Sequence, residues 1–286
     1  MAALFPNMTT KHEHPILVTG AAGAVGGIGR NVTEMLLGEG HKVRAMVRRE
    51  DARAEGLRRL GAEVIVGDLT DLAAVARHHG VEAIVNMSQM TVSQMSVTET
   101  TDSPQHKLHW LAEQALAWSG LPVVTMRPTV FLEGFFQAAA AAGVRDSDAL
   151  VLPLGGGRTA PISAVDVARA VALVLDEPAP HIGRIYDFTG PESADLTHFA
   201  KVFSEVLGRA IIYRDVPVDA WIGRMREVGL PEHLLAHLAA MARLHQQGRY
   251  DRMTDDFTRL TGQAPTSMRE FVQAHAAEFT RPATTA

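Results

Sequence analysis

The sequence contains no cysteine among its 286 residues. This absence excludes disulfides, thiolate catalysis and cysteine-ligated zinc or iron–sulfur sites. Charge of one sign is not in large excess either, because 27 Lys and Arg stand against 32 Asp and Glu, for a net charge of −5. No basic patch indicates nucleic acid as a partner, and no lysine run indicates an anionic membrane surface.

Long hydrophobic runs are also missing. The longest apolar region, residues 121–136, is interrupted by two prolines, an arginine and a glutamate, whereas a membrane-spanning helix needs about 20 apolar residues. Residues 1–13 lack the basic start and apolar stretch of a signal peptide. We therefore expect a cytoplasmic protein that makes no membrane contact, with a disordered leader over 1–13 and a frayed tail over 281–286.

Two kinds of catalytic motif are absent. The chain has thirteen histidines but no H-E-x-x-H and no paired carboxylates at metal-binding spacing, so we predict no metal site. It also has no G-x-S-x-G turn, which argues against a hydrolase of that type.

A glycine-rich stretch near the start of the chain indicates nucleotide binding. An apolar run ends at Thr19, a turn of glycine and alanine follows, and a segment of helical periodicity then places Ile28, Val32, Met35 and Leu36 on one stripe. A helix N-terminus presents free N–H groups and a partial positive charge to a diphosphate. Glycine lets the backbone approach that group closely.

The glycine spacing favours one class of dinucleotide-binding turn. Gly20, Gly23 and Gly26 give G-x-x-G-x-x-G, the spacing of short-chain dehydrogenases rather than G-x-G-x-x-G. Because glycines continue to Gly29, we expect the helix to begin late, with Gly29 rather than Gly26 closest to the sheet. The alternative is a tight strand-to-helix turn that holds no ligand.

Strands and helices alternate in the first half of the chain. After the run that ends at Thr19, the predicted strands are residues 42–47, 62–66, 81–88 and 123–126. Single helices between successive strands predict an α/β fold with a doubly wound parallel sheet of the Rossmann type. We expect a dinucleotide-binding domain over 14–150 and a smaller, mostly helical C-terminal substrate lobe over 151–280.

Between the fourth and fifth predicted strands, we predict a loop over 89–102 and a helix over 103–119. The order becomes less regular after Arg127 and Pro128, where we predict a helix over 134–142. Short strands are expected at 150–152 and 159–162, on either side of three consecutive glycines. Residues 218–279 are predicted to be mostly helical, and the last helix presents one apolar face made of Met268, Phe271, Val272 and Phe279.

Five segments together resemble the NmrA-like family of atypical short-chain dehydrogenases. They are T-G-A-A-G-A-V-G at 19–26, V-R-A-M-V-R-R at 43–49, V-G-D-L at 66–69, A-W-S-G-L-P-V-V-T-M-R-P at 117–128 and I-S-A-V-D-V-A at 162–168. The combination is specific to the superfamily and not to a substrate. The family includes NAD(P)H-dependent quinone, azo-dye and imine reductases, and also non-catalytic sensors of the NADPH/NADP balance.

The resemblance implies NADP(H) as the cofactor, with NAD(H) less favoured. The residues that would hold it are Gly20, Ala22, Gly23, Val25, Gly26, Arg48, Asp68 and Leu69. Arg48 follows the second strand, where a basic residue would meet the 2′-phosphate of NADP and where an NAD enzyme usually has an acidic one. The alternatives are a solvated arginine pair at a strand end and a capping or turn role for Asp68.

One strand–helix unit is missing from the family's order. A single predicted helix, 71–79, separates the third predicted strand from 81–88, and residues 81–90 resemble the family's fifth strand rather than its fourth. The absent unit would be about 30 residues long, and its strand would stand beside the adenosine and the nicotinamide ribose. Either the sheet closes around the gap or the cofactor site is altered.

The Tyr-x-x-x-Lys pair found in typical short-chain dehydrogenases is absent as well. Its helix here has the sequence S-P-Q-H-K-L-H-W-L-A-E, with Gln105 in the Tyr place and His109 in the Lys place, four residues apart on one face. That face borders an apolar stripe of Leu108, Ala112 and Ala115. Glutamine cannot act as a general acid, so His109 is predicted to orient the ribose or to donate a proton. The alternative is a polar helix edge at the surface.

The remaining candidates lie near the carboxyl ends of strands, where ligands bind in such folds. Ser88 is a second candidate catalytic residue. Met87, Met90, Phe131 and Phe135 are predicted to line a substrate pocket, and the alternative is that they fill the core.

The sequence thus predicts an oxidoreductase that transfers hydride between NADP(H) and a small conjugated or carbonyl-type molecule, such as a quinone, an azo compound or an imine. The first alternative is a non-catalytic NADP(H)-binding redox sensor or regulatory protein. A second is a family scaffold that no longer binds nucleotide. We expect a small-molecule substrate, no nucleic acid, and a monomer or homodimer.

Overall fold

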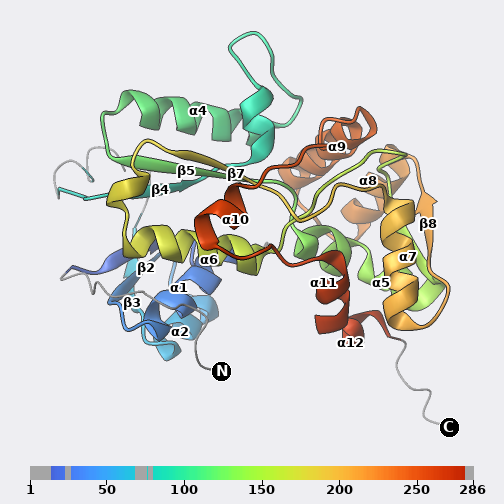
Figure 1. Ribbon diagram of the computed structural model, residues 1–286, viewed down its shortest axis with the longest axis horizontal. Helices are drawn as coiled ribbons and strands as arrows, with labels where there is room; N and C mark the ends of the chain where they lie inside the picture. Colours follow the sequence, from blue (N-terminus) through green and yellow to red (C-terminus); the bar gives the residue numbers. More distant parts are fainter. Residues whose placement is uncertain (1–13, 23–26, 68–75, 77–79, 281–286) are drawn as a thin grey trace. The chain divides into compact units, whose positions relative to one another are not determined.

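The computed structural model of the protein describes residues 14–22, 27–67, 76 and 80–280. The chain divides into two compact units, each built from three stretches (Figure 1). Unit 1 comprises Met1–Met87, Glu113–Met126 and Ala164–Ile185, and unit 2 comprises Ser88–Ala112, Arg127–Ser163 and Tyr186–Ala286. The predicted assignment of 14–150 to the dinucleotide and 151–280 to the substrate stays a prediction.

The described strands confirm an α/β fold built on parallel pairs. They are β1 (Ile16–Thr19), β2 (Val43–Val47), β3 (Glu63–Val66), β4 (Ile84–Met87), β5 (Val123–Pro128), β6 (Ala149–Leu152), β7 (Ile185–Phe188) and β8 (Ile212–Asp215). Their order in the sheets is β1-β2-β3, β4-β5-β7 and β6-β8. The pairs β1–β2, β2–β3, β4–β5 and β6–β8 are parallel.

Helices account for most of the rest of the described chain. The α-helices are α1 (Ile28–Gly38), α2 (Ala52–Arg59), α4 (Pro104–Trp118), α5 (Ala141–Ser147), α6 (Ala164–Asp176), α7 (Leu196–Leu207), α8 (Val218–Glu227), α9 (Glu232–Gln246), α10 (Asp256–Thr261), α11 (Met268–Ala274) and α12 (Ala276–Phe279). The 3-10 helices are η1 (Met90–Gln94) and η3 (Ala179–His181), and a π-helix is η2 (Glu133–Ala139). None of the described helices is long and apolar enough to cross a membrane.

The described strands of unit 1 fall into separate sheets, at the place where the sequence predicts a missing strand–helix unit. The strands β1 and β4 fall in two different three-stranded sheets, so the described strands do not close around the gap. β1 pairs with β2 from Ile16↔Val43 to Thr19↔Met46, and Leu17 on β1 is 44% exposed. The predicted helix 71–79 lies outside the described residues except for Ala76, which is buried.

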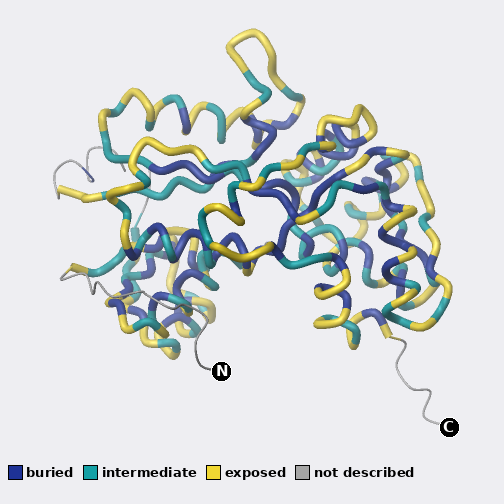
Figure 2. The backbone as a smooth tube through the Cα atoms, in the orientation of Figure 1, coloured by how far each residue is buried: buried dark blue, intermediate teal, exposed yellow. Residues whose placement is uncertain are grey.

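The helix α6 packs against both parts of unit 1. It contacts α1 extensively and also contacts β4, and it is buried along most of its length (Figure 2). On the α1 side, Val32 and Leu36 are buried, which confirms the predicted apolar stripe. At the end of α6, the Oδ1 atom of Asp176 lies 3.3 Å from Nε2 of His41, and both side chains are buried.

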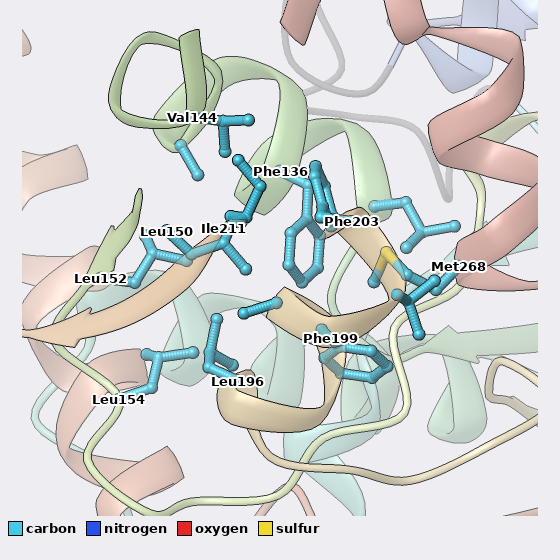
Figure 3. Close-up of a cluster of buried hydrophobic side chains, with 14 of the residues drawn as sticks. Phe136, Val144, Leu150, Leu152, Leu154, Leu196, Phe199, Phe203, Ile211 and Met268 are labelled. Carbon is cyan, nitrogen blue, oxygen red and sulfur yellow. The ribbon is translucent and has the colours of Figure 1, made fainter. Parts of the chain in front are cut away.

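Unit 2 has its own aromatic core. Phe136 of η2 packs edge-on against Phe199 of α7, with ring centroids 5.7 Å apart, and also against Phe203 at 5.8 Å (Figure 3). Phe203 in turn meets Phe279 at 5.0 Å. The predicted apolar face of the last helix is confirmed, because its four members are buried, although His275 separates the helix into α11 and α12.

Three local predictions differ from the structure. The predicted loop 89–102 contains the 3-10 helix η1, and the predicted helix 134–142 is the π-helix η2 followed by α5. The predicted strand 159–162 makes only two isolated bridges. Pro161 explains the last difference, because it has no N–H to continue a ladder.

The three consecutive glycines after β6 serve helix packing. A Cβ at Gly157 would lie 2.1 Å from the carbonyl oxygen of His245 in α9, whereas a Cβ at Gly156 would meet nothing within 4 Å. Gln246 adds a hydrogen bond of 2.9 Å from Nε2 to the carbonyl oxygen of Pro153. Gly157 is therefore needed because the backbone of α9 comes too close for any side chain.

We expect Gly157→Ala to lower the free energy of unfolding by about 1–3 kcal/mol, because the new methyl group overpacks against the α9 backbone. Gly156→Ala is the matched control and should leave stability within about 1 kcal/mol of the wild type. Urea unfolding at neutral pH compares the two variants. Equal stabilities would show that the close approach of the loop to α9 does not constrain the fold.

Candidate functional site

The predicted diphosphate turn of unit 1 brings two backbone segments very close together. Gly20 follows β1 with φ +72°, and Gly27 precedes α1 with φ +61°. A Cβ at Gly29 would lie 2.8 Å from the carbonyl oxygen of Gly20. The helix begins at Ile28, as the late start predicts, and only a glycine at position 29 lets it pack on the end of β1.

The start of α1 has the features that a bound diphosphate needs. Among the described residues, no side chain caps this helix end, and a helix N-terminus of this kind can present its first N–H groups to an anion. The carbonyl oxygen of Ala22 accepts a hydrogen bond of 3.2 Å from Nη1 of Arg53. The described part of the turn therefore fits a dinucleotide. Five predicted cofactor residues lie outside the described residues, namely Gly23, Val25, Gly26, Asp68 and Leu69.

The charges that follow β2 are arranged in pairs. Arg48 is exposed directly after the strand. Glu50 lies 2.7 Å from the guanidinium of Arg58, and Asp51 lies 2.6 Å from that of Arg53. Hydrogen bonding to Arg53 lowers the pKa of Asp51 to about 2. Both acidic residues near Arg48 are thus engaged by other arginines.

In unit 2, the segment after β4 presents polar atoms without partners. Ser88 is buried, and neither its Oγ nor Nε2 of Gln89 has a hydrogen-bond partner among the described residues. The next three residues, Met90, Thr91 and Val92, are buried in η1. Buried polar groups are nearly always paired in proteins, so these two atoms have hydrogen-bonding capacity that the described residues do not use.

Three residues in or beside this segment escaped the sequence analysis, namely Thr91, Tyr250 and His245. The hydroxyl of Thr91 donates a hydrogen bond of 2.9 Å to Oη of Tyr250. The Tyr250 ring stacks on His245, with centroids 3.9 Å apart and an interplanar angle of 6°. His245 also contacts the ring of Phe135 at 5.4 Å. No local motif could have found this cluster, because its members are far apart in the sequence.

The helix α4 is oriented differently from the prediction. Leu108 is 66% exposed, and Ala112 and Ala115 are exposed too, so the apolar stripe does not face the core. The buried positions are instead polar, with His106 and Glu113 inside. Hydrogen bonding to Thr101 and a ring contact with His237 hold His106 inward and decide the orientation of this helix.

A buried histidine pair lies at the start of α4. Ser103 Oγ and His237 Nδ1 are 2.8 Å apart, and Thr101 Oγ1 and His106 Nδ1 are also 2.8 Å apart. The two imidazole rings meet edge-on with centroids at 4.9 Å. Burial, with smaller effects from His237 and His109, lowers the pKa of His106 to about 3. Burial and then His109 lower the pKa of His237 to about 4.

The structure brings some of the predicted residues together. Ser88 and Met90 share one short segment of unit 2, and Phe135 contacts it through His245 and Tyr250. Phe131 is half-buried beside Ile162. His109 is half-buried and Gln105 is exposed, while Met87 belongs to unit 1 with the glycine turn. Among the described residues, no group of three or more His, Cys, Asp or Glu could hold a metal ion.

Comparison with known proteins identifies the class. The family described as NAD(P)H-binding matches residues 23–79. An NAD(P)H azoreductase of Xenophilus azovorans is 26% identical, and the match covers 92% of this chain and 99% of that protein. The crystal structure of an NADPH-dependent quinone oxidoreductase from Escherichia coli superposes with a TM-score of 0.77 at 23% identity, covering 91% of this chain and 99% of that one.

A regulator has the same fold. The structure of NmrA, a negative transcriptional regulator in complex with NADP, gives a TM-score of 0.70 at 16% identity and covers 92% of this chain and 95% of that one. The family match and the shared fold support an NAD(P)-binding Rossmann-type domain. Its structural neighbours lie in the NmrA-like group of atypical short-chain dehydrogenases.

The azoreductase match also bears on the missing unit. It runs over 289 aligned positions, yet it uses only 92% of the 286 residues of this chain. The relative therefore has residues without a counterpart here. This agrees with the split between the β1 and β4 sheets.

The buried histidines predict acid sensitivity. Their pKa values lie below that of an unfolded histidine, about 6.5, so the unfolded state binds more protons once the pH falls below 6.5. Stability is therefore fully present above pH 6.5 and is lost as the pH falls toward 4, by up to roughly 1.4 kcal/mol per pH unit for each histidine. We expect His237→Asn, which keeps a partner for Ser103, to lose less stability between pH 6.5 and 4.5 than the wild type.

Denaturant unfolding across this pH range makes the comparison. His233→Asn is the control, because His233 is exposed on the same helix α9, and it should retain the wild-type slope. Identical slopes for all three proteins would contradict the burial of a neutral His237.

Proposed function

We propose that the chain is an NADP(H)-dependent reductase of small conjugated or carbonyl-type molecules, the class that includes quinones, azo compounds and imines. The observation that carries the proposal is the close approach of Gly29 to Gly20 at an uncapped helix start. The near full-length match to an NAD(P)H azoreductase supports the same reaction class. The enzyme is proposed to act on a small molecule and not on nucleic acid.

The cofactor would be held by backbone and charge. Gly20, Ala22 and the free N–H groups of α1 would bind the diphosphate, as would the turn residues Gly23, Val25 and Gly26, with Asp68 and Leu69 beside the adenine. Arg48 would bind the 2′-phosphate. Because Glu50 and Asp51 are paired with Arg58 and Arg53, they neutralise Arg48 less, which favours NADP(H) over NAD(H).

The chain's own contribution to catalysis would be orientation of the two reactants. When bound, the nicotinamide supplies or accepts the hydride. Ser88 and Gln89 offer unpaired polar atoms to the substrate, and Met90, Phe131 and Phe135 of the same unit offer apolar surface. The role predicted for Met87, a residue of unit 1, stays a prediction. His109 orients the ribose or delivers the proton, for which water is the other source.

A second candidate function is a non-catalytic NADP(H)-binding sensor. Gln105, in the place of the usual tyrosine, cannot donate a proton as an acid. The fold shared with the regulator NmrA, solved with NADP, supports this alternative. The chain is proposed to be cytoplasmic and either a monomer or a homodimer.

Cofactor choice gives the first test. Titrated NADPH should raise the melting temperature, since a ligand that binds only the folded state at one hundred times its Kd adds about 2.7 kcal/mol. Arg48→Ala should weaken NADPH binding about tenfold or more and leave NADH binding nearly unchanged. Arg59→Ala, an exposed arginine on α2, is the control for net charge. Equal loss of both nucleotides would remove Arg48 from the 2′-phosphate site.

Turnover gives the second test. NADPH oxidation should be observed with a simple quinone or azo dye, and His109→Ala should lower kcat by about 10²-fold if His109 is the proton donor. Lys107→Ala, two residues away and exposed, should retain wild-type kcat. NADPH binding without oxidation of any acceptor would favour the sensor.

A further inference from the structure

The turn after α9 fastens the segment after β4 at three points. Thr91 Oγ1 donates to Tyr250 Oη at 2.9 Å. Arg249 Nε donates to Oε1 of Gln94 at 2.7 Å, and Nε2 of that glutamine donates to the carbonyl oxygen of Arg249 at 3.2 Å. We call these contacts, together with those of Arg252 below, the Tyr250 clamp.

The third point is the guanidinium of Arg252, which hydrogen-bonds both a backbone carbonyl and a side chain of η1. Arg252 Nη1 donates to the carbonyl oxygen of Met90 at 3.2 Å and to Oγ of Ser93 at 2.9 Å. Within η1, Oγ of Ser93 donates a hydrogen bond of 2.7 Å to the same carbonyl oxygen of Met90. Both ends of η1 are therefore fixed to one short turn that lies far away in the sequence.

Tyr250 is the only buried member of the turn that meets η1 through its side chain. It is 5% exposed and packs with Val130, Met241 and Leu244. Its ring stacks on His245, and burial raises the pKa of its hydroxyl to about 12. The phenol therefore stays neutral, and its place is fixed by packing on every side.

The clamp explains how unpaired polar atoms persist beside it. A buried donor or acceptor without a partner costs about 1–3 kcal/mol, so a free segment would rearrange to pair Ser88 and Gln89. The clamp begins two residues later, at Met90, and prevents that rearrangement. The same stacked rings also contact Phe135, so one cluster fixes two of the proposed substrate-binding elements.

We propose that Tyr250 is a positioning residue that sets substrate specificity, because its hydroxyl holds η1 so that Ser88 and Gln89 stay unpaired and face the substrate. This inference rests on the proposed reductase function. The inference gives Tyr250 a positioning role in the proposed reaction and no chemical step. Its failure can be separated from failure of the reductase proposal, because the position of η1 is measurable without turnover.

The central variant is Tyr250→Phe, which keeps the stacked ring and removes one hydroxyl. Tyr213→Phe is the control, since the half-buried Tyr213 also uses its hydroxyl in hydrogen bonds, with Leu152, Leu154 and Asp215 outside the clamp. Hydrogen exchange reports on η1 through the amides of Val92 and Met95, which bond Gln89 and Val92. Tyr250→Phe should speed their exchange at least fivefold, and Tyr213→Phe should not.

Specificity is read from kcat/KM for menadione and for the azo dye methyl red, at saturating NADPH. Tyr250→Phe should change the ratio of the two values at least fivefold and leave the KM for NADPH unchanged. Faster exchange with an unchanged ratio would reduce Tyr250 to a structural role and overturn the inference. Unchanged exchange would overturn it too.

Thr91 provides the rescue experiment. Thr91→Val removes the same hydrogen bond from the other side and should reproduce the effect of Tyr250→Phe, whereas Thr91→Ser should keep the wild-type ratio. The double variant should be no worse than either single one, as expected for partners in one bond. Additive effects would contradict a shared contact.

A wild type that oxidises no NADPH with either compound would refute the reductase proposal. The inference is then decided by binding, with thermal shifts for menadione and methyl red. A change of fivefold or more in the ratio of their Kd values in Tyr250→Phe supports it. An unchanged ratio, or no binding of either compound to the wild type, overturns it.

Discussion

In a single parallel sheet, backbone hydrogen bonds connect all the strands. In unit 1, helix packing connects β1 and β4 instead. β1 and β4 lie in different sheets, and α6 contacts both α1 and β4. Alanine and valine fill its buried face, so α1 can approach closely without a large side chain between the helices. The buried pair His41–Asp176 fixes the end of α6. The glycine at position 29 packs α1 on the end of β1, and α1 is in turn supported by α6.

Unit 2 is organised by contacts between residues that are distant in the sequence. Because position 157 is a glycine, the backbone of α9 can approach the loop at His245. The turn after α9 contains Tyr250, whose hydroxyl accepts a hydrogen bond from Thr91. Each contact depends on the one before it. Met90 and Phe135, which are proposed to contact the substrate, are therefore positioned by an element outside the motifs that identify the fold.

This difference explains what the sequence could predict. The strands β1 to β5, the start of α1 and the apolar face shared by α11 and α12 follow from local periodicity and glycine placement, and the structure confirms them. The predicted strand 159–162 does not form. The orientation of α4 could not be predicted that way, because His106 is drawn inward by Thr101 and His237 while Leu108 faces out. The pairing of Thr91 with Tyr250 spans 159 positions, and no pattern in one sequence encodes such a distance.

The split between β1 and β4 also shows which piece of such a fold can be left out. A strand and its following helix return the chain to the same edge of the sheet from which it left. Omitting both keeps every later strand running in its original direction, whereas omitting either alone would reverse the polarity of all that follow. The strand–helix pair is therefore the smallest module that a parallel sheet could lack without reversing the direction of the strands that follow.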